Sequence, residues 1–267
     1  MNKNTELISY LVNYRQADDI LAGSPFIRPN YDGYSIYNLP ASICSWLDIP
    51  VLNGTPLSGS LHQHLQDKYQ HVILLLIDGL GYDWLNEYLN SDSSLGLNRQ
   101  QIWNRFFGNC PDLAITSIAP STTATALTTL WTGAYPAEHG VMGYEMLLKE
   151  YGILANMITH APASYTGDAG SIYRAGFRLE DFLPVPTLGP HFKENQVKAF
   201  SFMPGHISNS SLTKMHTPDI TVIPFYAISD LWASMQNIYQ ANIHEKTYHF
   251  LYWGLLDELM HRFGPQD

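Results

Sequence analysis

The feature that most constrains this chain is a continuous apolar run that ends in a carboxylate. All residues of Val72–Ile77 are aliphatic, and Asp78 and Gly79 follow them directly. Such a short run, apolar at every position, is typical of a strand in a parallel sheet that is covered on both faces. Asp78 is then either a ligand carboxylate on a tight turn or an ordinary turn or helix-capping residue.

Strand and helix patterns alternate along much of the sequence. Further strands are expected at residues 114–118, 153–158, 197–203 and 248–254, and helices at residues 6–21, 82–89, 123–131 and 231–239. This alternation predicts an α/β fold with a mostly parallel sheet and a site beyond the carboxyl ends of its strands. Because Asp78, the Thr122/Thr123 pair and Asp257 each follow a strand candidate, we expect them to meet at one sheet edge.

Composition and charge narrow the class of protein. With 45% hydrophobic and 14% charged residues, the 267-residue chain can bury a sizeable core. Its formal net charge of −10 and lack of a dense Lys/Arg run argue against a nucleic-acid duplex as partner. The two cysteines, Cys44 and Cys110, form no metal-binding or disulfide pattern. Without a signal-peptide pattern or an apolar run of the roughly 20 residues that span a bilayer, we expect a cytoplasmic protein with no membrane partner.

A threonine-rich segment forms one of the predicted helices. Its hydroxyls are at Thr122, Thr123, Thr125, Thr128 and Thr129, although threonine is a mediocre helix former. A hydroxyl in the first turn would lie in the positive field of the helix N-terminus, which stabilises an alkoxide and attracts phosphate oxygens. The alternative is a capped helix that packs closely through its small residues.

Asp257 and His261 form a third group of candidate functional residues. Their spacing of four residues places both on one face of a helix, where they can hold a cation together. Most isolated pairs of this kind are ordinary surface pairs, but this one follows an aromatic strand.

Together these segments resemble the type I phosphodiesterase/nucleotide pyrophosphatase family of the alkaline phosphatase superfamily. The resemblance rests on the strand before Asp78-Gly79, the Thr-rich helix, the segment Thr132-Gly133-Ala134-Tyr135-Pro136-Ala137-Glu138-His139-Gly140, and Asp257 with His261 before Phe263-Gly264-Pro265. It implies a three-layer α/β/α sandwich and a metal-dependent phosphoric-ester hydrolase. It also implies two divalent metal ions, most simply Zn²⁺, and a small phosphoester or nucleotide as substrate.

The resemblance also implies a role for each site residue. Asp78 would bind one metal ion, and Asp257 with His261 the second. The nucleophile of the family lies nine positions before the position of Thr132, which makes it Thr123, a ligand of the first ion, with Thr122 as the alternative. His139 matches a family position, where we expect a structural role.

Two departures from the family pattern affect these expectations. Ala126 replaces an asparagine that steadies a phosphate oxygen in many pyrophosphatases of the family. The family also supplies an Asp-His pair and a further histidine after the position of His261, and this sequence contains no Asp-His dipeptide. Because the missing ligands would follow His261, we expect a catalytic domain over residues 71–267 that lacks its C-terminal part and is inactive alone. Residues 1–70, which precede the α/β pattern, are expected to form an N-terminal extension that packs on this domain.

Alternative functions remain open at this stage. A phosphomonoesterase, a phosphomutase-like enzyme or a non-catalytic, degenerate relative would carry many of the same residues. The polar loop Ser208-Asn209-Ser210-Ser211 is able to approach a substrate, while the scattered histidines (His160, His191, His206, His216, His244 and His249) are expected to be structural. The oligomeric state does not follow from the sequence.

Overall fold

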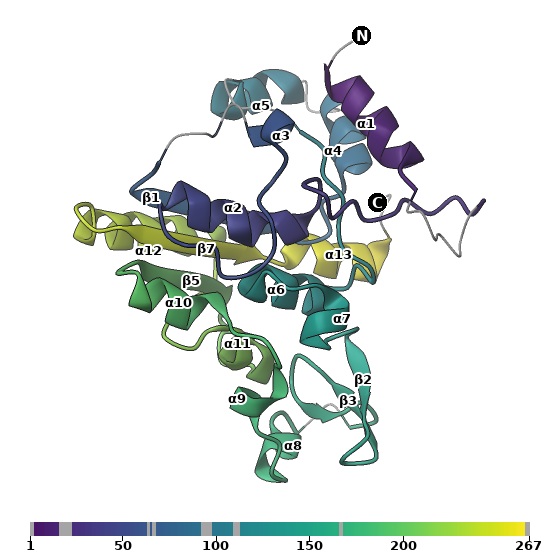
Figure 1. Ribbon diagram of the computed structural model, residues 1–267, viewed down its shortest axis with the longest axis vertical. Helices are drawn as coiled ribbons and strands as arrows, with labels where there is room; N and C mark the ends of the chain where they lie inside the picture. The colour runs from purple at the N-terminus through teal and green to yellow at the C-terminus, as the bar shows by residue number, and fades with distance from the viewer. Residues whose placement is uncertain are drawn as a thin grey trace.

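A four-stranded parallel sheet forms the centre of the molecule (Figure 1). The computed structural model describes residues 3–15, 23–62, 65, 68–91, 98–108, 113–165 and 168–264. In spatial order the strands are β1 (His71–Ile77), β7 (Thr247–Trp253), β5 (Lys198–Pro204) and β6 (Thr221–Phe225). β7, latest of these strands in sequence, pairs with both β1 and β5, so Ile77 lies beside Trp253 and Phe202 beside Leu251.

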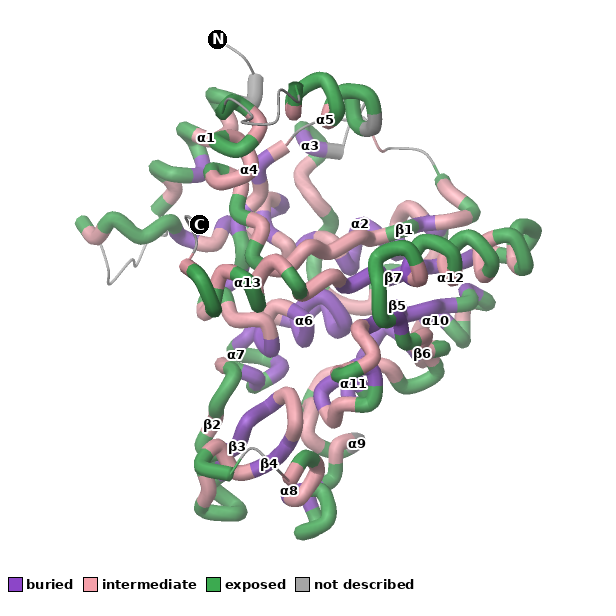
Figure 2. Tube along the Cα trace, turned by 180° about the vertical axis from the view of Figure 1, so that it is seen from behind, coloured by how far each residue is buried: buried purple, intermediate pink, exposed green. Residues whose placement is uncertain are grey.

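Helices cover both faces of this sheet, which confirms the three-layer α/β/α prediction. One face carries α2 (Leu39–Trp46), α6 (Thr123–Thr132) and α10 (Leu188–Glu194), and the other carries α12 (Ile228–Ala241). The first interface buries Trp131 and Phe192 against Tyr248 and Phe250. The second buries Leu231 against Phe202 and other strand residues. In Figure 2, α6 and the central strands accordingly show as largely buried.

We expected β1 to be covered on both faces, but one of its faces is partly exposed. Val72 is buried, but the side chain of Ile73 on the opposite face is 46% exposed. In the described part of the chain β1 is an edge strand, and the α12 core includes only Leu75 from it, partly buried. An apolar run therefore predicts the strand correctly here but overstates its burial.

A smaller antiparallel sheet forms a second lobe, at the bottom of Figure 1. Its strands are β2 (Glu145–Leu148), β3 (Ile153–Asn156) and β4 (Ala161–Pro162), accompanied by α8 (Ser171–Arg174), α9 (Leu179–Phe182) and α11 (Ser211–His216). The strand expected at residues 153–158 is thus real but belongs to this lobe, since β3 pairs antiparallel with β2 and β4. Met157, Phe177 and Met215 are in its core, which also includes Ala124 of α6.

The strand expected at residues 114–118 does not exist as part of a sheet. Thr116 forms only an isolated bridge with Ser35, because its backbone exchanges hydrogen bonds with Tyr34 and Ile36 of the N-terminal region. The prediction that Thr123 follows a sheet strand is therefore wrong, although α6 begins where the pattern placed it.

The remaining elements surround the sheet. They are α1 (Lys3–Asn13), η1 (Ile36–Asn38), α3 (Gly59–His62), α4 (Tyr82–Asn90), α5 (Arg99–Phe107), α7 (Pro136–His139) and α13 (Leu255–Phe263). The first predicted helix ends earlier than expected, at Asn13, and residues 16–21 of that prediction lie outside the described residues, as does Cys110. Cys44 is a buried free thiol, and burial raises its pKa to about 11. No helix among the described segments is long and apolar enough to span a bilayer.

The division at residue 70 stays a prediction. Residues before it contribute to the central core, because Ile43, Cys44 and Leu47 pack in the same cluster as the strands.

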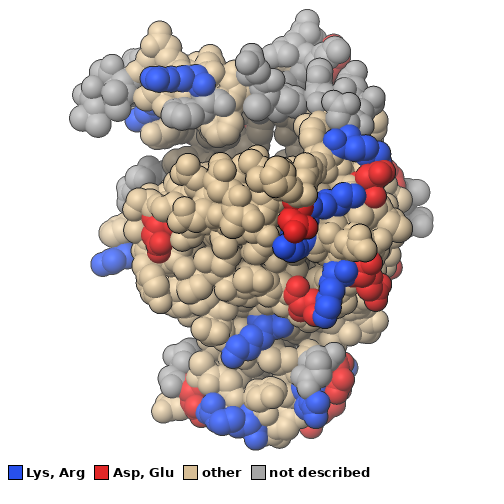
Figure 3. All heavy atoms as spheres, turned by 90° about the vertical axis from the view of Figure 1, so that its left-hand side faces the viewer, with Lys and Arg blue, Asp and Glu red and all other residues tan. Residues whose placement is uncertain are grey.

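Charged side chains of both signs are interspersed over the face shown in Figure 3, with wide uncharged areas between them.

Candidate active site at the carboxyl end of the sheet

Asp78 is held at the carboxyl end of β1 by backbone interactions on both sides. Its N–H donates to the carbonyl of Trp253 at 3.0 Å, which continues the ladder between β1 and β7. Its Oδ1 accepts from the N–H of Gly79 at 3.1 Å. Gly79 has φ +80°, and a Cβ there would lie 3.0 Å from the Cα of Asp257. Glycine therefore allows both the turn and the close approach of α13.

Two hydroxyls converge on the other oxygen of Asp78. Thr123 Oγ1 donates to Asp78 Oδ2 at 3.0 Å, and the Tyr252 hydroxyl donates to the same atom at 2.6 Å. Burial and the negative charge of Asp78 raise the pKa of Tyr252, so this phenol remains a donor. The structure thus brings together Asp78 and Thr123, two residues that sequence reasoning assigned to one site.

Thr123 is the first residue of α6, so it lies where the helix leaves backbone N–H groups without intrahelical acceptors. Thr122 is the N-cap residue, but its side chain makes no capping hydrogen bond; its Oγ1 instead lies 2.9 Å from that of Thr125. The described contacts therefore direct Thr123, and not Thr122, toward Asp78. The positive end of a ten-residue helix also favours an anion at this point.

The other threonines of α6 have structural partners. Thr128 Oγ1 lies 2.8 Å from His216 Nε2, and Thr129 Oγ1 lies 3.0 Å from His139 Nε2. Both histidines are buried, which lowers the pKa of His139 to about 4 and that of His216 to about 3 and keeps them neutral. The threonine content of this helix therefore reflects buried polar packing beyond its first turn. His139 matches its expected structural role.

Asp257 and His261 lie on one face of α13, close to Gly79. His261 Nε2 is 3.5 Å from Asp257 Oδ2, and the His261 side chain is 81% exposed. Burial and the charge of Asp78 raise the pKa of Asp257, while His261 opposes that shift. The two carboxylates thus repel one another, and neither forms an ion pair with Lys or Arg among the described residues.

The donor atoms suit divalent metals in kind but are few. Carboxylate oxygens, a hydroxyl and an imidazole are the donors that zinc accepts, in the pairs Asp78 with Thr123 and Asp257 with His261. A catalytic zinc site usually has three protein ligands and an open position. Within the described ranges, no group of three or more His, Cys, Asp or Glu residues is placed to hold one ion. The residues present therefore fit two partial metal sites.

A small cavity of about 30 Å³ lies beside Thr123. Tyr252, Ser201, Ser210 and His216 are among the residues that line it. Ser210 belongs to the polar loop that was expected to approach a substrate, and it also caps α11 by accepting from the N–H of Thr213. This places the loop next to the candidate nucleophile.

Sequence reasoning missed Tyr252 as a member of the site. The signal that could have found it is its position in the strand: Tyr252 pairs with Leu76, two residues before Asp78. A polar tip on an otherwise aromatic, buried strand usually requires a partner near the strand end.

The fold and this edge define an α/β protein with a hydroxyl, two carboxylates and a helix N-terminus at the carboxyl end of a parallel sheet. A family model described as type I phosphodiesterase / nucleotide pyrophosphatase matches residues 72–267, which is most of the chain. The chain belongs to this family, whose members are hydrolases of small phosphoester and nucleotide substrates. No curated protein and no solved structure gave a match in the corresponding comparisons.

Proposed function

We propose that this protein hydrolyses phosphodiester or pyrophosphate bonds of small nucleotide-like substrates, with Thr123 as the nucleophile. The observation that carries the proposal is the 3.0 Å hydrogen bond from Thr123 Oγ1 to Asp78 Oδ2 at the first residue of α6. A hydroxyl so placed has a carboxylate to orient it and a positive helix end to receive phosphoryl oxygens.

The chain's own residues divide the work as follows. Asp78 orients the hydroxyl of Thr123 and accepts its hydrogen bond, while Tyr252 holds the same carboxylate oxygen in place. The free N–H groups at the start of α6 stabilise the charge that develops on the phosphoryl oxygens. Thr123 Oγ1 loses its proton and attacks phosphorus, and the alcohol or phosphate that leaves takes up a proton. The intermediate is a phosphodiester of Thr123 that keeps the other ester group of the substrate, and water hydrolyses it to restore the hydroxyl.

Two divalent cations complete the proposal, and zinc suits the donors. Asp78 and Thr123 would hold one ion, and Asp257 with His261 would hold the other. When bound, such ions lower the pKa of a bound hydroxyl or water and neutralise phosphoryl charge. The raised pKa of Asp257 supports this assignment, because a nearby cation would relieve the repulsion from Asp78.

Each proposed ion has two ligands from this group, one short of a usual catalytic zinc site. Residues 1–267 alone are therefore proposed to bind zinc weakly and to turn over little substrate. Activity would require further ligands besides these four residues.

The test compares residues 1–267 with the product of the native gene, whatever its length. Each is assayed with zinc on bis(4-nitrophenyl) phosphate and 4-nitrophenyl phosphate. Quenched samples are examined by mass spectrometry for the group left on Thr123, which is a 4-nitrophenyl phosphoryl group from the diester and a phosphoryl group from the monoester. We expect the native product to prefer the diester and to carry a 4-nitrophenyl phosphoryl group on Thr123. A native product that prefers the monoester would favour a phosphomonoesterase, and phosphate on Thr122 would move the nucleophile by one residue. Absence of both turnover and phosphorylation would indicate a non-catalytic relative.

A further inference from the structure

A second, larger pocket lies between α8 of the antiparallel lobe and α11. It encloses about 640 Å³, within the roughly 300–1,000 Å³ typical of small-molecule sites. Its walls come from Gly170, Tyr173 and Arg174 on one side and from residues that include His206 and Lys214 on the other. Thr123, Asp78 and Asp257 do not line it, although it shares part of its wall with the cavity beside Thr123.

This pocket is lined by basic residues, although the whole chain has more acidic than basic residues. The sequence has 14 basic and 24 acidic residues. Arg174, His206 and Lys214 all line the pocket, whereas no Asp or Glu is among the described lining residues. A concave site lined by one sign of charge focuses the field and concentrates ions of the other sign.

Of the Lys and Arg residues that line the pocket, Lys214 is the one that has no ion pair among the described residues. Lys68, Lys193 and Lys198 each form an ion pair with a carboxylate. Arg174 pairs with Asp168 and donates to the carbonyl of Ala169. Among the described residues, no carboxylate pairs with Lys214, so its ammonium is available to a ligand.

The remaining lining residues match an anion attached to an organic group. Asn209 and Ser211 offer neutral polar groups near Lys214, and the Tyr173 ring is half exposed. Ile158, Leu179 and Met215 supply an apolar wall on which the organic part can lie.

We propose that this pocket binds a small phosphorylated molecule and that the Lys214 ammonium pairs with its phosphate. The proposal does not depend on the catalytic function proposed above. Two sources of the phosphate are possible, because Ile158, Ile207 and Ser210 line both this pocket and the cavity beside Thr123. The phosphate then belongs either to a remote part of the substrate or to a separate ligand.

The binding test uses residues 1–267 and inorganic pyrophosphate in the presence of EDTA, followed by calorimetry and by amide chemical shifts. We expect saturable binding that weakens with salt and about a fivefold loss of affinity in Lys214→Gln, since one charge-assisted contact is removed. Lys214→Arg should restore most of the affinity. Lys149→Gln, an equal charge change at an exposed site on the same lobe, should leave it unchanged.

The proposal is overturned if the wild-type chain shows no saturable binding, or if Lys214→Gln and Lys149→Gln bind pyrophosphate equally well. It is also overturned if Thr123→Ala abolishes binding, because the probe would then occupy the active site. Retained binding in Thr123→Ala, with the loss confined to Lys214→Gln, supports it.

A kinetic arm on the native gene product identifies the source of the phosphate. If the substrate supplies it, Lys214→Gln raises KM for a dinucleoside polyphosphate severalfold but not KM for bis(4-nitrophenyl) phosphate. If a separate ligand supplies it, both KM values stay unchanged while pyrophosphate binding is lost. Both outcomes support the pocket and differ only in what fills it.

Discussion

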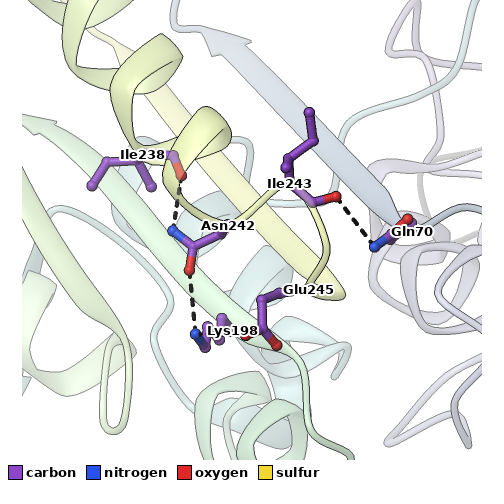
Figure 4. A network of polar contacts seen from close by, with 6 residues as sticks. All are labelled: Gln70, Lys198, Ile238, Asn242, Ile243 and Glu245. Atoms are coloured by element: carbon purple, nitrogen blue, oxygen red, sulfur yellow. Dashed lines mark hydrogen bonds and ion pairs between the residues drawn. The ribbon is translucent and has the colours of Figure 1, made fainter.

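The two ends of the central sheet differ in how their charged side chains are paired. At the amino end, Lys198 bonds to Asn242 at 3.3 Å and pairs with Glu245 at 3.2 Å, and Gln70 donates to the carbonyl of Ile243 (Figure 4). At the carboxyl end, Asp78 and Asp257 face each other, with hydroxyls and an exposed imidazole as their described partners.

This difference separates a stabilising end from a reactive one. At the amino end, the charge of Lys198 is satisfied by the protein's own groups. The carboxyl end keeps two repelling carboxylates beside a helix N-terminus, which costs stability in the free protein and favours a cation and a phosphate. Binding sites are commonly formed from groups that the fold leaves incompletely paired.

Acid should produce the largest change. Burial lowers the pKa of His139, His160 and His249 to about 4 and that of His216 to about 3. Their unfolded pKa is near 6.5, so stability is fully present above that pH and falls by up to about 1.4 kcal/mol per pH unit for each histidine below it. Asp257 opposes this trend, since its pKa is raised, but it is one group against four. We expect cooperative unfolding before pH reaches about 4, measured by circular dichroism and denaturant titration.

Hydrogen exchange sharpens that test. His139 and His216 bond to threonines of α6, whereas His249 bonds to Thr247 at the amino end of β7. Because two buried histidines contact α6 and one contacts β7, amides of α6 should lose protection more steeply as the pH falls than those of β7. His249→Gln should reduce the pH slope, and the exposed His244→Gln should leave it unchanged; equal slopes in both variants would contradict the assignment.

Loss of the Thr123 hydroxyl should have the next largest effect. In the native gene product, Thr123→Ala should reduce diester turnover by roughly a thousandfold or more, because the nucleophile is removed. Thr123→Ser should retain partial activity. Thr122→Ala is the matched control, since this neighbouring hydroxyl faces Thr125. Undiminished turnover in Thr123→Ala would end the proposed covalent mechanism.

Removal of one carboxylate should stabilise the carboxyl end. Because burial and Asp78 raise the pKa of Asp257, its ionised form is disfavoured in the folded state at neutral pH. Asp257→Asn should raise the unfolding free energy in EDTA by up to about 1 kcal/mol, with solvent screening included. The same variant should weaken zinc binding in calorimetry. A lower melting temperature in EDTA would show that Asp257 is already satisfied by the protein.

The matched substitution at the amino end should have the smallest effect and the opposite sign. Glu245→Gln removes the partner of Lys198 from a half-exposed ion pair. Such pairs contribute little, so we expect a loss of less than about 1 kcal/mol in denaturant unfolding. A stabilising effect here would remove the contrast between the two ends.

Local patterns predicted the elements of this fold well. The apolar run before Asp78, the aromatic strand before Asp257 and the helix at Thr123 are all where the sequence placed them. These elements are defined by side-chain period and strand ends, which are properties of neighbouring residues.

The strand or side chain with which each element pairs was less predictable, because this pairing depends on residues far apart in the chain. Residues 153–158 have the apolar character of a core strand, yet β3 joins the second sheet. The proline in β6 (Pro224) weakened its strand pattern, and that edge strand was missed. The Tyr252 hydroxyl reaches Asp78 across 174 residues of sequence, a contact that no local pattern encodes.

The position of β7 has a consequence for synthesis of the protein. β7 is the last strand along the described chain, yet it lies between β1 and β5. His71 of β1 meets Thr247 of β7 across 176 residues. At about 5–20 residues per second, a ribosome needs roughly 9 to 35 seconds to supply that partner. During this interval β1 and β5 emerge without the strand that joins them, and their unpaired edges are open to chaperones or to neighbouring nascent chains. The yield of folded protein in a cell should therefore depend on how quickly translation reaches β7.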